Sequence, residues 1–216
     1  MILELHSEAD VDRVVPVVRE HLGAGGLLAY PTETVYGLGS APTAEAVGRL
    51  AQFKGRPPGK PFLLLVSGRP MAEAWGLDFP PAARALSDAF WPGPLTLVLP
   101  GGDGRLPARL RGPEGGIAVR HTSHAGMARL IAALGYPITS TSANRPGGPP
   151  APGAEGLETL FADALADGTL LALDGGVLGN VPPSTIVDCT TPVTRMVREG
   201  ALPRDELRRA AGRLAP

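Results

Sequence analysis

Short, uninterrupted runs of apolar residues alternate along this sequence with segments of helical periodicity. The clearest runs are LLAYP (27–31), PFLLLVS (61–67) and LTLVLP (95–100). A strand that is apolar at every position is buried on both faces, and helices are the elements that cover such strands. The alternation therefore predicts an α/β fold, in which a sheet is covered by helices.

The remaining expected elements follow the same two patterns. Further strands are expected over 2–5, 117–121, 136–142, 170–174, 184–189 and 193–199. Helices are expected, from apolar residues at helical spacing, over 10–22, 43–53, 70–76, 81–90, 124–134, 154–167 and 203–213. Only Thr190, Thr191 and Pro192 separate the last two strands, which predicts a hairpin. We therefore expect a twisted, mixed sheet with parallel and antiparallel pairs.

The organisation of the chain indicates one domain. The 29 Gly and 24 Pro residues are spread between the apolar segments, which is typical of many tight loops. The low-complexity stretch RPGGPPAPG (145–153) is short. Because no internal repeat or long linker is visible, we expect a single domain over residues 1–216.

Charge and cysteine content exclude several classes of protein. The net charge of −1 argues against a broadly basic nucleic-acid coat and against a polybasic membrane anchor. The N-terminus MILELHSEAD is acidic rather than signal-like, and no apolar run reaches roughly 18 residues. The single Cys189 excludes an internal disulfide and a cysteine-pair zinc site. We expect a cytoplasmic protein without membrane contact.

Lysine is almost absent, and the two lysines lie close together. Of 20 basic residues only Lys54 and Lys60 are lysines, and both fall in FKGRPPGKPF (53–62) with Arg56. No acidic residue lies between 46 and 72 to offset these like charges. A rigid, uncompensated cation cluster indicates an anion from outside, such as a polyphosphate. The alternative is a solvated surface loop.

Two other loops carry hydroxyl groups and glycines directly after apolar strands. They are YPTETVYGLGS (30–40) and STSANRPGG (140–148), and open α/β sheets bind ligands at such strand ends. Neither is a Walker loop or a nucleophile elbow. Arg120 ends another strand and suits a carboxylate. His121 and His124 lack a third ligand nearby, so we interpret them as surface histidines rather than a metal site.

Seven motifs in order resemble the YrdC family of threonylcarbamoyl-adenylate synthases over residues 7–202. They are PTETVYGLG, KGR, WPGPLTLVL, VRH with the later His124, SAN followed by glycines, PSTIVD and REGA. The resemblance implies a mixed sheet around a deep, positively lined cavity. It also implies a single-domain family member, with no additional C-terminal domain such as longer members carry. It also implies synthesis of threonylcarbamoyl-AMP and pyrophosphate from L-threonine, bicarbonate and ATP. A partner complex would then transfer the threonylcarbamoyl group to a tRNA adenosine.

The resemblance also implies roles for particular residues. Catalytic residues around the ATP phosphates would be Lys54, Arg56, Ser142 and Asn144. Further ATP contacts would come from Lys60, Gly116 and Arg198. The amino acid would be held by Thr32, Arg120, Ser140 and Ser184. No protein-bound metal is expected, because Mg²⁺ can travel on the ATP phosphates.

The sequence departs from the family pattern in two places, and two rival functions stay open. Thr122 stands where many relatives have proline, and Pro149 and Pro150 lie near a position often occupied by serine. One rival is a non-catalytic RNA-binding or translation-associated module, although an aromatic content of 5% offers few stacking platforms. The other is a carbamoyl-transfer module. Direct binding of tRNA or double-stranded RNA is left open by the sequence.

Overall fold

The computed structural model describes residues 1–179, 181–212 and 215. Within these residues one ten-stranded sheet runs through the whole molecule. Its strands are β1 (Ile2–Glu4), β2 (Leu27–Tyr30), β3 (Gly37–Gly39), β4 (Leu63–Leu65), β5 (Leu95–Leu99), β6 (Ile117–Arg120), β7 (Ile138–Ser142), β8 (Leu170–Asp174), β9 (Thr185–Asp188) and β10 (Arg195–Arg198).

The sheet is mixed, as the sequence predicts. The strand order is β1-β8-β2-β3-β7-β4-β6-β5-β9-β10. Parallel pairs are β1/β8, β2/β8, β4/β6 and β5/β9. The other five neighbouring pairs are antiparallel. The last of them, β9/β10, is the expected hairpin.

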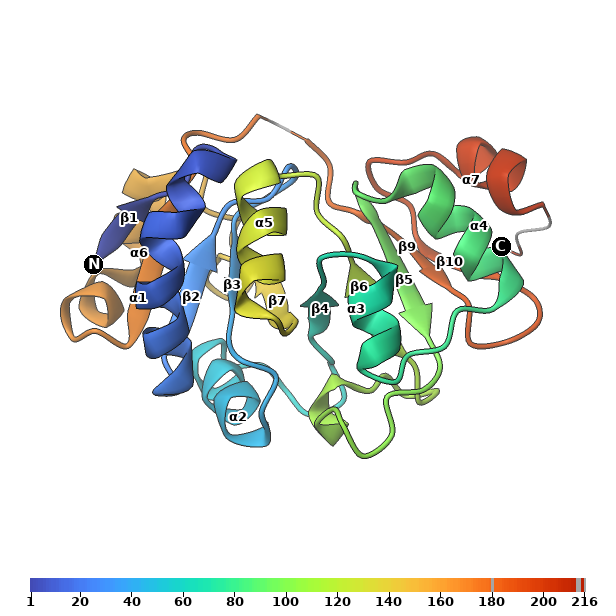
Figure 1. The fold of residues 1–216 in the computed structure, drawn as a ribbon, viewed down its shortest axis with the longest axis horizontal. Helices are drawn as coiled ribbons and strands as arrows, with labels where there is room; N and C mark the ends of the chain where they lie inside the picture. Colours follow the sequence, from blue (N-terminus) through green and yellow to red (C-terminus); the bar gives the residue numbers. More distant parts are fainter. Residues whose placement is uncertain (180, 213–214, 216) are drawn as a thin grey trace.

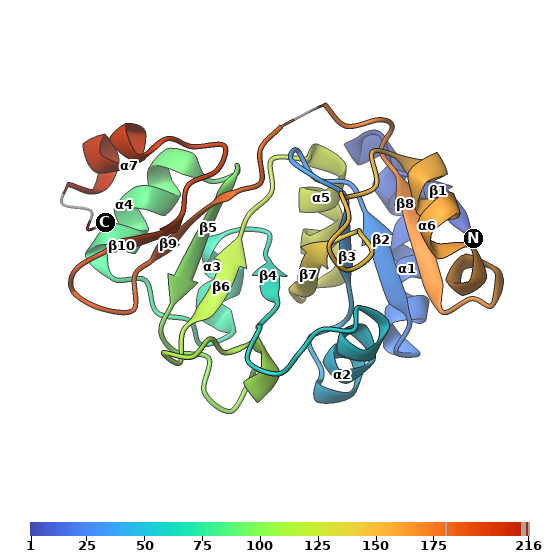
Figure 2. The same ribbon diagram turned by 180° about the vertical axis from the view of Figure 1, so that it is seen from behind.

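Helices cover the two faces of the sheet unequally (Figures 1 and 2). They are α1 (Val11–Gly23), α2 (Ala44–Phe53), α3 (Arg69–Ala74), α4 (Pro81–Phe90), α5 (Ala125–Leu134), α6 (Ala154–Ala166) and α7 (Arg204–Ala211), with 3₁₀ turns η1 (Glu8–Asp10) and η2 (Ala108–Leu110). The face toward the viewer in Figure 1 carries α1, α5, α3 and α4. From behind, α6 and α2 lie toward one end, and strands β4, β6 and β5 are seen without a helix in front of them.

Two groups of buried apolar side chains hold the helices to the sheet. One group joins α1 and α5 to the strands beneath, with Val14, Val18, Leu130 and Ile131 among its members. A larger group spreads over the rest of the sheet and includes Leu64 of β4. The continuous apolar strands are therefore buried as the sequence predicts, and their burial fixes the sheet that carries the loops.

Strand β3 is an element that the sequence did not predict. It consists of Gly37, Leu38 and Gly39, and glycine disfavours strands. A Cβ atom on Gly39 would lie 2.0 Å from the backbone oxygen of Thr139, so only glycine permits this close approach of β3 to β7. The expected helix over 203–213 is shorter in the structure, where α7 ends at Ala211. Its residue 213 lies outside the described residues. In the part of the chain that is described, no helix is both long and apolar enough to cross a membrane.

Candidate active site

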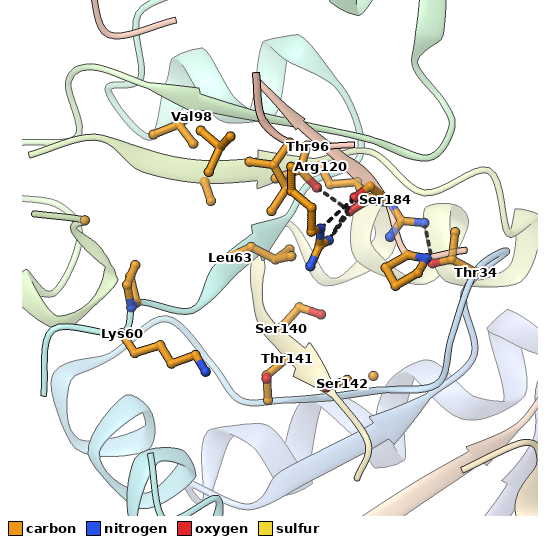
Figure 3. Close-up of a pocket in the computed structure, with 18 of the residues that line it drawn as sticks. Thr34, Lys60, Leu63, Thr96, Val98, Arg120, Ser140, Thr141, Ser142 and Ser184 are labelled. Atoms are coloured by element: carbon orange, nitrogen blue, oxygen red, sulfur yellow. Dashed lines mark hydrogen bonds between the residues drawn. The ribbon is translucent and has the colours of Figure 1, made fainter. Parts of the chain in front are cut away.

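A cavity of about 700 Å³ lies where loops from both halves of the sheet meet (Figure 3). This volume is within the range of roughly 300–1,000 Å³ typical of small-molecule sites. The structure brings together in its walls the predicted site residues Thr32, Arg56, Lys60, Gly116, Arg120, Ser140, Ser142, Asn144, Ser184 and Arg198. Thr32 and Arg198 thus line the same cavity, although they are 166 positions apart in sequence.

Arg120 and Ser184 lie at one end of the cavity. Arg120 ends β6, and its Nε donates to the Gly93 carbonyl at 3.3 Å while Nη2 donates to Thr34 Oγ1 at 3.0 Å. Ser184 precedes β9, and its hydroxyl lies 2.8 Å from Thr96 Oγ1. Figure 3 shows the Arg120–Thr34 and Ser184–Thr96 contacts as dashed lines. The arginine side chain is only 6% exposed, so it is held in one orientation.

Arg198 lies over the same end, on the edge strand β10. Its Nη2 donates to the Ser184 carbonyl at 2.8 Å. Burial, and to a smaller extent the nearby charge of Arg120, lowers the pKa of Arg198 from its ordinary value. Two guanidinium groups near one another favour an anion at this end of the cavity.

Hydrogen bonds of the Thr32 side chain hold the loop between β2 and β3 in a turn. The Thr32 hydroxyl donates to the Val35 carbonyl at 2.7 Å and accepts from the backbone N–H groups of Thr34 and Val35 at 3.2 Å. This is the local hydrogen bonding that threonine offers in turns. Ser140, on β7, is 8% exposed and also lines the cavity.

The cation loop after α2 places Arg56 and Lys60 in the cavity wall. Arg56 is fixed by donation to the carbonyls of Lys60 and Pro61, at 2.9 and 2.5 Å, and to Thr141 Oγ1 at 3.0 Å. Its guanidinium also stacks on the Phe62 ring, 4.6 Å from the centroid. Lys60 is exposed and lines the cavity. The loop is therefore rigid at Arg56, as its prolines and glycines predict.

Lys54 is placed differently from the other predicted site residues. Its ammonium is directed into the 142–144 loop rather than into the cavity wall. It donates to the carbonyls of Ser142 and Asn144 at 3.0 and 2.5 Å and to Asn144 Oδ1 at 2.9 Å. These bonds use all three N–H donors of a lysine. Burial, with the charges of Arg56 and Lys60, lowers the pKa of Lys54 to about 8.

The 142–144 loop is held by its own polar side chains as well. Ser142 Oγ donates to Asn144 Oδ1 at 2.6 Å. The Asn144 amide nitrogen donates to the carbonyls of Arg145 and Gly148 at 2.9 Å each. The expected phosphate contacts from Lys54 and Asn144 stay a prediction, because in this structure both side chains bind the loop itself.

The far end of the cavity contains Gly116 and an ion-paired group. A Cβ on Gly116 would lie 2.5 Å from Thr190 Cγ2 and 2.6 Å from Val98 Cγ1, so the position favours glycine. Arg195 Nη2 lies 3.1 Å from Glu114 and 3.2 Å from Asp188. Both cavity carboxylates are thus paired with one arginine. Among the described residues, no group of three His, Cys, Asp or Glu side chains is arranged to hold a metal ion.

Glu33 and Thr122 belong to the site region, and sequence reasoning did not select them as site residues. Glu33 Oε1 lies 2.6 Å from Arg120 Nη2. The other oxygen, Oε2, accepts a hydrogen bond from the Thr122 hydroxyl. Although burial alone would raise it, the pKa of Glu33 is lowered because of Arg120 and Thr122. The available signal for Glu33 was that it is the one carboxylate in the hydroxyl-rich loop YPTETVYGLGS (30–40). The sequence marks Thr122 only as a departure from the family's usual proline, and its contact with Glu33 was not foreseen.

The interpretation of His121 and His124 as surface histidines is wrong. Both are partly buried, and burial lowers the pKa of each. His124 is the N-cap of α5, where its Nδ1 accepts from the Met127 backbone N–H at 3.2 Å. His121 packs edge-on against the Trp91 ring, 6.5 Å between centroids. These histidines thus support the fold around the Arg120 loop.

The chain is thus an α/β protein with a mixed sheet, and arginine and lysine side chains line its cavity. The family model Sua5_yciO_yrdC, described as telomere recombination, matches residues 20–200. The chain belongs to this family, which confirms the resemblance seen in the sequence.

Individual relatives agree with this assignment. The "Threonylcarbamoyl-AMP synthase" of Chromohalobacter salexigens is 41% identical over 180 residues, covering 82% of this chain and 92% of that protein. The solved structure of P. abyssi Sua5 complexed with L-threonine has a TM-score of 0.88 at 32% identity. It matches 100% of this chain, which spans 63% of that protein. The E. coli YciO structure has a TM-score of 0.78 at 27% identity, with 93% and 95% of the two chains covered.

Proposed function

We propose that this chain is a threonylcarbamoyl-AMP synthase, which makes threonylcarbamoyl-AMP and pyrophosphate from L-threonine, bicarbonate and ATP. The observation that carries the proposal is a single cavity with Arg120 and three hydroxyl-bearing residues at one end and the Arg56–Lys60 loop in its wall. The carboxylate of an amino acid and the phosphates of a nucleotide are the anions that these two cation groups fit. The 41% identical synthase supports the same reaction.

The amino acid would bind at the Arg120 end. Nε and Nη2 of Arg120 already have protein partners, which leaves Nη1 for the substrate carboxylate. Thr32, Ser140 and Ser184 surround this end with hydroxyl groups that can bind the amine and side-chain oxygen. A relative that is 32% identical was solved in complex with L-threonine, which supports threonine as the amino acid.

ATP would occupy the remainder of the cavity. Arg56 and Lys60 would contact the phosphates directly, with Arg198, Ser142 and Asn144 around them and the backbone at Gly116 beside the nucleoside. Lys54 would act through the 142–144 loop, which its three hydrogen bonds hold in place. Asp188 and Glu114 are paired with Arg195. Mg²⁺ would therefore be carried by the ATP phosphates rather than by a carboxylate pair.

The chemistry needs positioning and charge stabilisation. The threonine amine attacks bicarbonate, water leaves, and a carbamate forms. A carbamate oxygen then attacks the α-phosphorus, and the bond to pyrophosphate breaks. Two anions must meet in this step, so fixed cations lower its barrier and stabilise the departing pyrophosphate. The burial of Arg120 and the fixed position of Arg56 suit this requirement.

Several finer points form part of the same proposal. A partner complex would transfer the threonylcarbamoyl group from the product to a tRNA adenosine, and direct tRNA contact stays a prediction. A cytoplasmic location is part of the proposal, because the product would serve tRNA modification. The single-domain organisation over residues 1–216 also stays a prediction.

The decisive experiment is mass spectrometry of the product made from ATP, L-threonine and ¹³C-bicarbonate. We expect a threonylcarbamoyl-AMP ion that carries the ¹³C label, and pyrophosphate release that requires all three substrates. Arg56→Ala is the matched variant and should lose both signals. An RNA-binding module would release no pyrophosphate, and a carbamoyl-transfer module would release it without threonine once a carbamoyl donor is added. Either result would contradict the proposal.

A further inference from the structure

Glu33 is a charged residue beside the cavity to which the proposed reaction assigns no role. It lies in the loop between β2 and β3, between Thr32 and Thr34, which both line the cavity. Its carboxylate instead reaches the end of β6, where it contacts Arg120 and Thr122. The Glu33 side chain is 20% exposed and that of Arg120 is 6% exposed. The contact is therefore largely shielded from water.

The contact between Glu33 and Arg120 is chiefly electrostatic. Glu33 Oε1 lies 2.6 Å from Arg120 Nη2, yet within the described residues this buried oxygen makes no hydrogen bond. Nη2 donates instead to Thr34 Oγ1 at 3.0 Å. Charges that are shielded from solvent attract each other strongly. Glu33 thus draws one edge of the guanidinium toward the β2–β3 loop.

This attraction decides which part of Arg120 faces the cavity. The Nε–Nη2 edge is occupied by the Gly93 carbonyl, Thr34 and Glu33. Nη1 has no hydrogen-bond partner in the part of the chain that is described, and Arg120 lines the cavity. A buried arginine also needs a counter-charge when no substrate is present, and Glu33 supplies it.

We propose that Glu33 is a positioning residue for amino-acid recognition, which holds the Nε–Nη2 edge of Arg120 so that Nη1 meets the substrate carboxylate. Thr122 supports Glu33 by donating to its second oxygen. This inference rests on the proposed function, because it takes Arg120 as the carboxylate-binding residue. It does not make Glu33 a general base. Arg120 and Thr122 keep the pKa of Glu33 low, and a carboxylate with a low pKa is a weak base.

The test is calorimetric titration of Glu33→Gln, which keeps the shape of the side chain and removes its charge. The ligands are L-threonine, L-threoninamide, which lacks the carboxylate, and ATP. We expect L-threonine to bind at least about tenfold more weakly, because a small displacement of a binding group has a large effect. L-threoninamide and ATP should keep their wild-type Kd within a factor of about two. Preference for the acid over the amide is the readout that general structural damage would not change.

Two further variants complete the experiment. Thr122→Val keeps the volume and removes the hydroxyl, so it should weaken L-threonine binding in the same direction but less. The melting temperature shows whether Glu33→Gln is folded. If it is not, Thr122→Val tests the proposal through the same preference for L-threonine over L-threoninamide. Glu45→Gln removes a carboxylate from an exposed ion pair with Arg49 and should leave all three Kd values unchanged.

The outcomes separate this inference from the proposed function. Wild-type protein that does not bind L-threonine would overturn the proposed function, and the inference with it. Wild-type binding with an unchanged L-threonine Kd in folded Glu33→Gln would overturn the inference alone. The inference would also be overturned if Glu33→Gln lost affinity for L-threonine and L-threoninamide equally. A lower kcat of Glu33→Gln at saturating threonine, with KM unchanged, would overturn it too.

Discussion

The Nζ atom of Lys54 donates a hydrogen bond to Oδ1 of Asn144 at 2.9 Å, across 90 residues of sequence. Two more bonds from the same ammonium reach the backbone of the 142–144 loop. Lys54 and Arg56 are two residues apart, yet the first holds a loop of the cavity and the second faces the cavity directly. Their substitution should therefore have different consequences.

Lys54→Ala should reduce both catalysis and stability. Loss of the loop anchor should lower kcat/KM for adenylate formation by at least ~100-fold, the scale of losing one electrostatic donor. The freed carbonyls of Ser142 and Asn144 should also lower the free energy of unfolding by roughly 1–3 kcal/mol. Pyrophosphate release and chemical denaturation measure the two effects. An exposed arginine, Arg13, provides the control variant Arg13→Ala. Full activity of Lys54→Ala would contradict the assigned role.

Because of Lys54, activity should fall and the free energy of unfolding should rise as the pH increases above 8. The pKa of Lys54 is lowered to about 8, so adenylate formation should decline as pH rises through 8 and the ammonium is lost. In the unfolded chain lysine keeps its proton to about pH 10.4. Between these values the unfolded state binds more protons, so the free energy of unfolding rises with pH.

The comparison for this pH dependence is Lys54→Met. The stability of the wild-type protein relative to Lys54→Met should increase between pH 8 and 10, while wild-type activity falls. Denaturation curves at several pH values measure the first effect, and initial rates measure the second. A stability difference that is constant over this range would show that the pKa of Lys54 is not lowered.

Arg120→Lys should damage threonine use more than ATP use. The guanidinium binds Gly93, Thr34 and Glu33 while leaving Nη1 for substrate, and an ammonium cannot reproduce that set of contacts. We expect a raised KM for L-threonine with the KM for ATP little changed. Equal threonine KM values in the two proteins would remove Arg120 from this role.

The order of amino-acid preference should be threonine, then serine, then valine. Loss of the methyl group costs roughly 1–3 kcal/mol, so serine should be disfavoured by ~10- to 200-fold. Valine lacks the hydroxyl and would leave a buried polar partner such as Ser140 unpaired, which costs more. Values of kcat/KM for the three amino acids test this order. Faster turnover of valine than of serine would mean that the cavity selects shape rather than the hydroxyl.

Most of the fold could be predicted because burial on both faces leaves a direct mark on strand composition. The predicted strand LTLVLP became β5, and the predicted helix over 81–90 is α4. Strand β3 could not be predicted, since Gly37 and Gly39 look like a loop in the sequence, and Gly39 is required by the close approach of Thr139. That requirement comes from a segment about a hundred residues away.

The candidate site could be predicted as a set of residues but not as a set of contacts. Arg56 and Lys60 line the cavity, as the charge cluster indicates. The direction of the Lys54 ammonium depends on carbonyl groups of the 142–144 loop, and backbone acceptors leave no signature in a sequence. The pairing of Glu33 with Arg120 depends in the same way on how β6 ends beside the β2–β3 loop.

The parallel pairing of β9 with β5 has a consequence for biosynthesis. Leu95 of β5 pairs with Thr185 of β9, and the segment from Pro183 to Arg198 supplies Ser184, Asp188, Arg195 and Arg198 to the cavity. A ribosome makes this segment after every other wall of the cavity has been synthesised. Pairings between distant segments also form slowly in folding. A nascent chain therefore has no complete site for ATP or an amino acid, and ligands can stabilise the protein only after its C-terminal strands have joined the sheet.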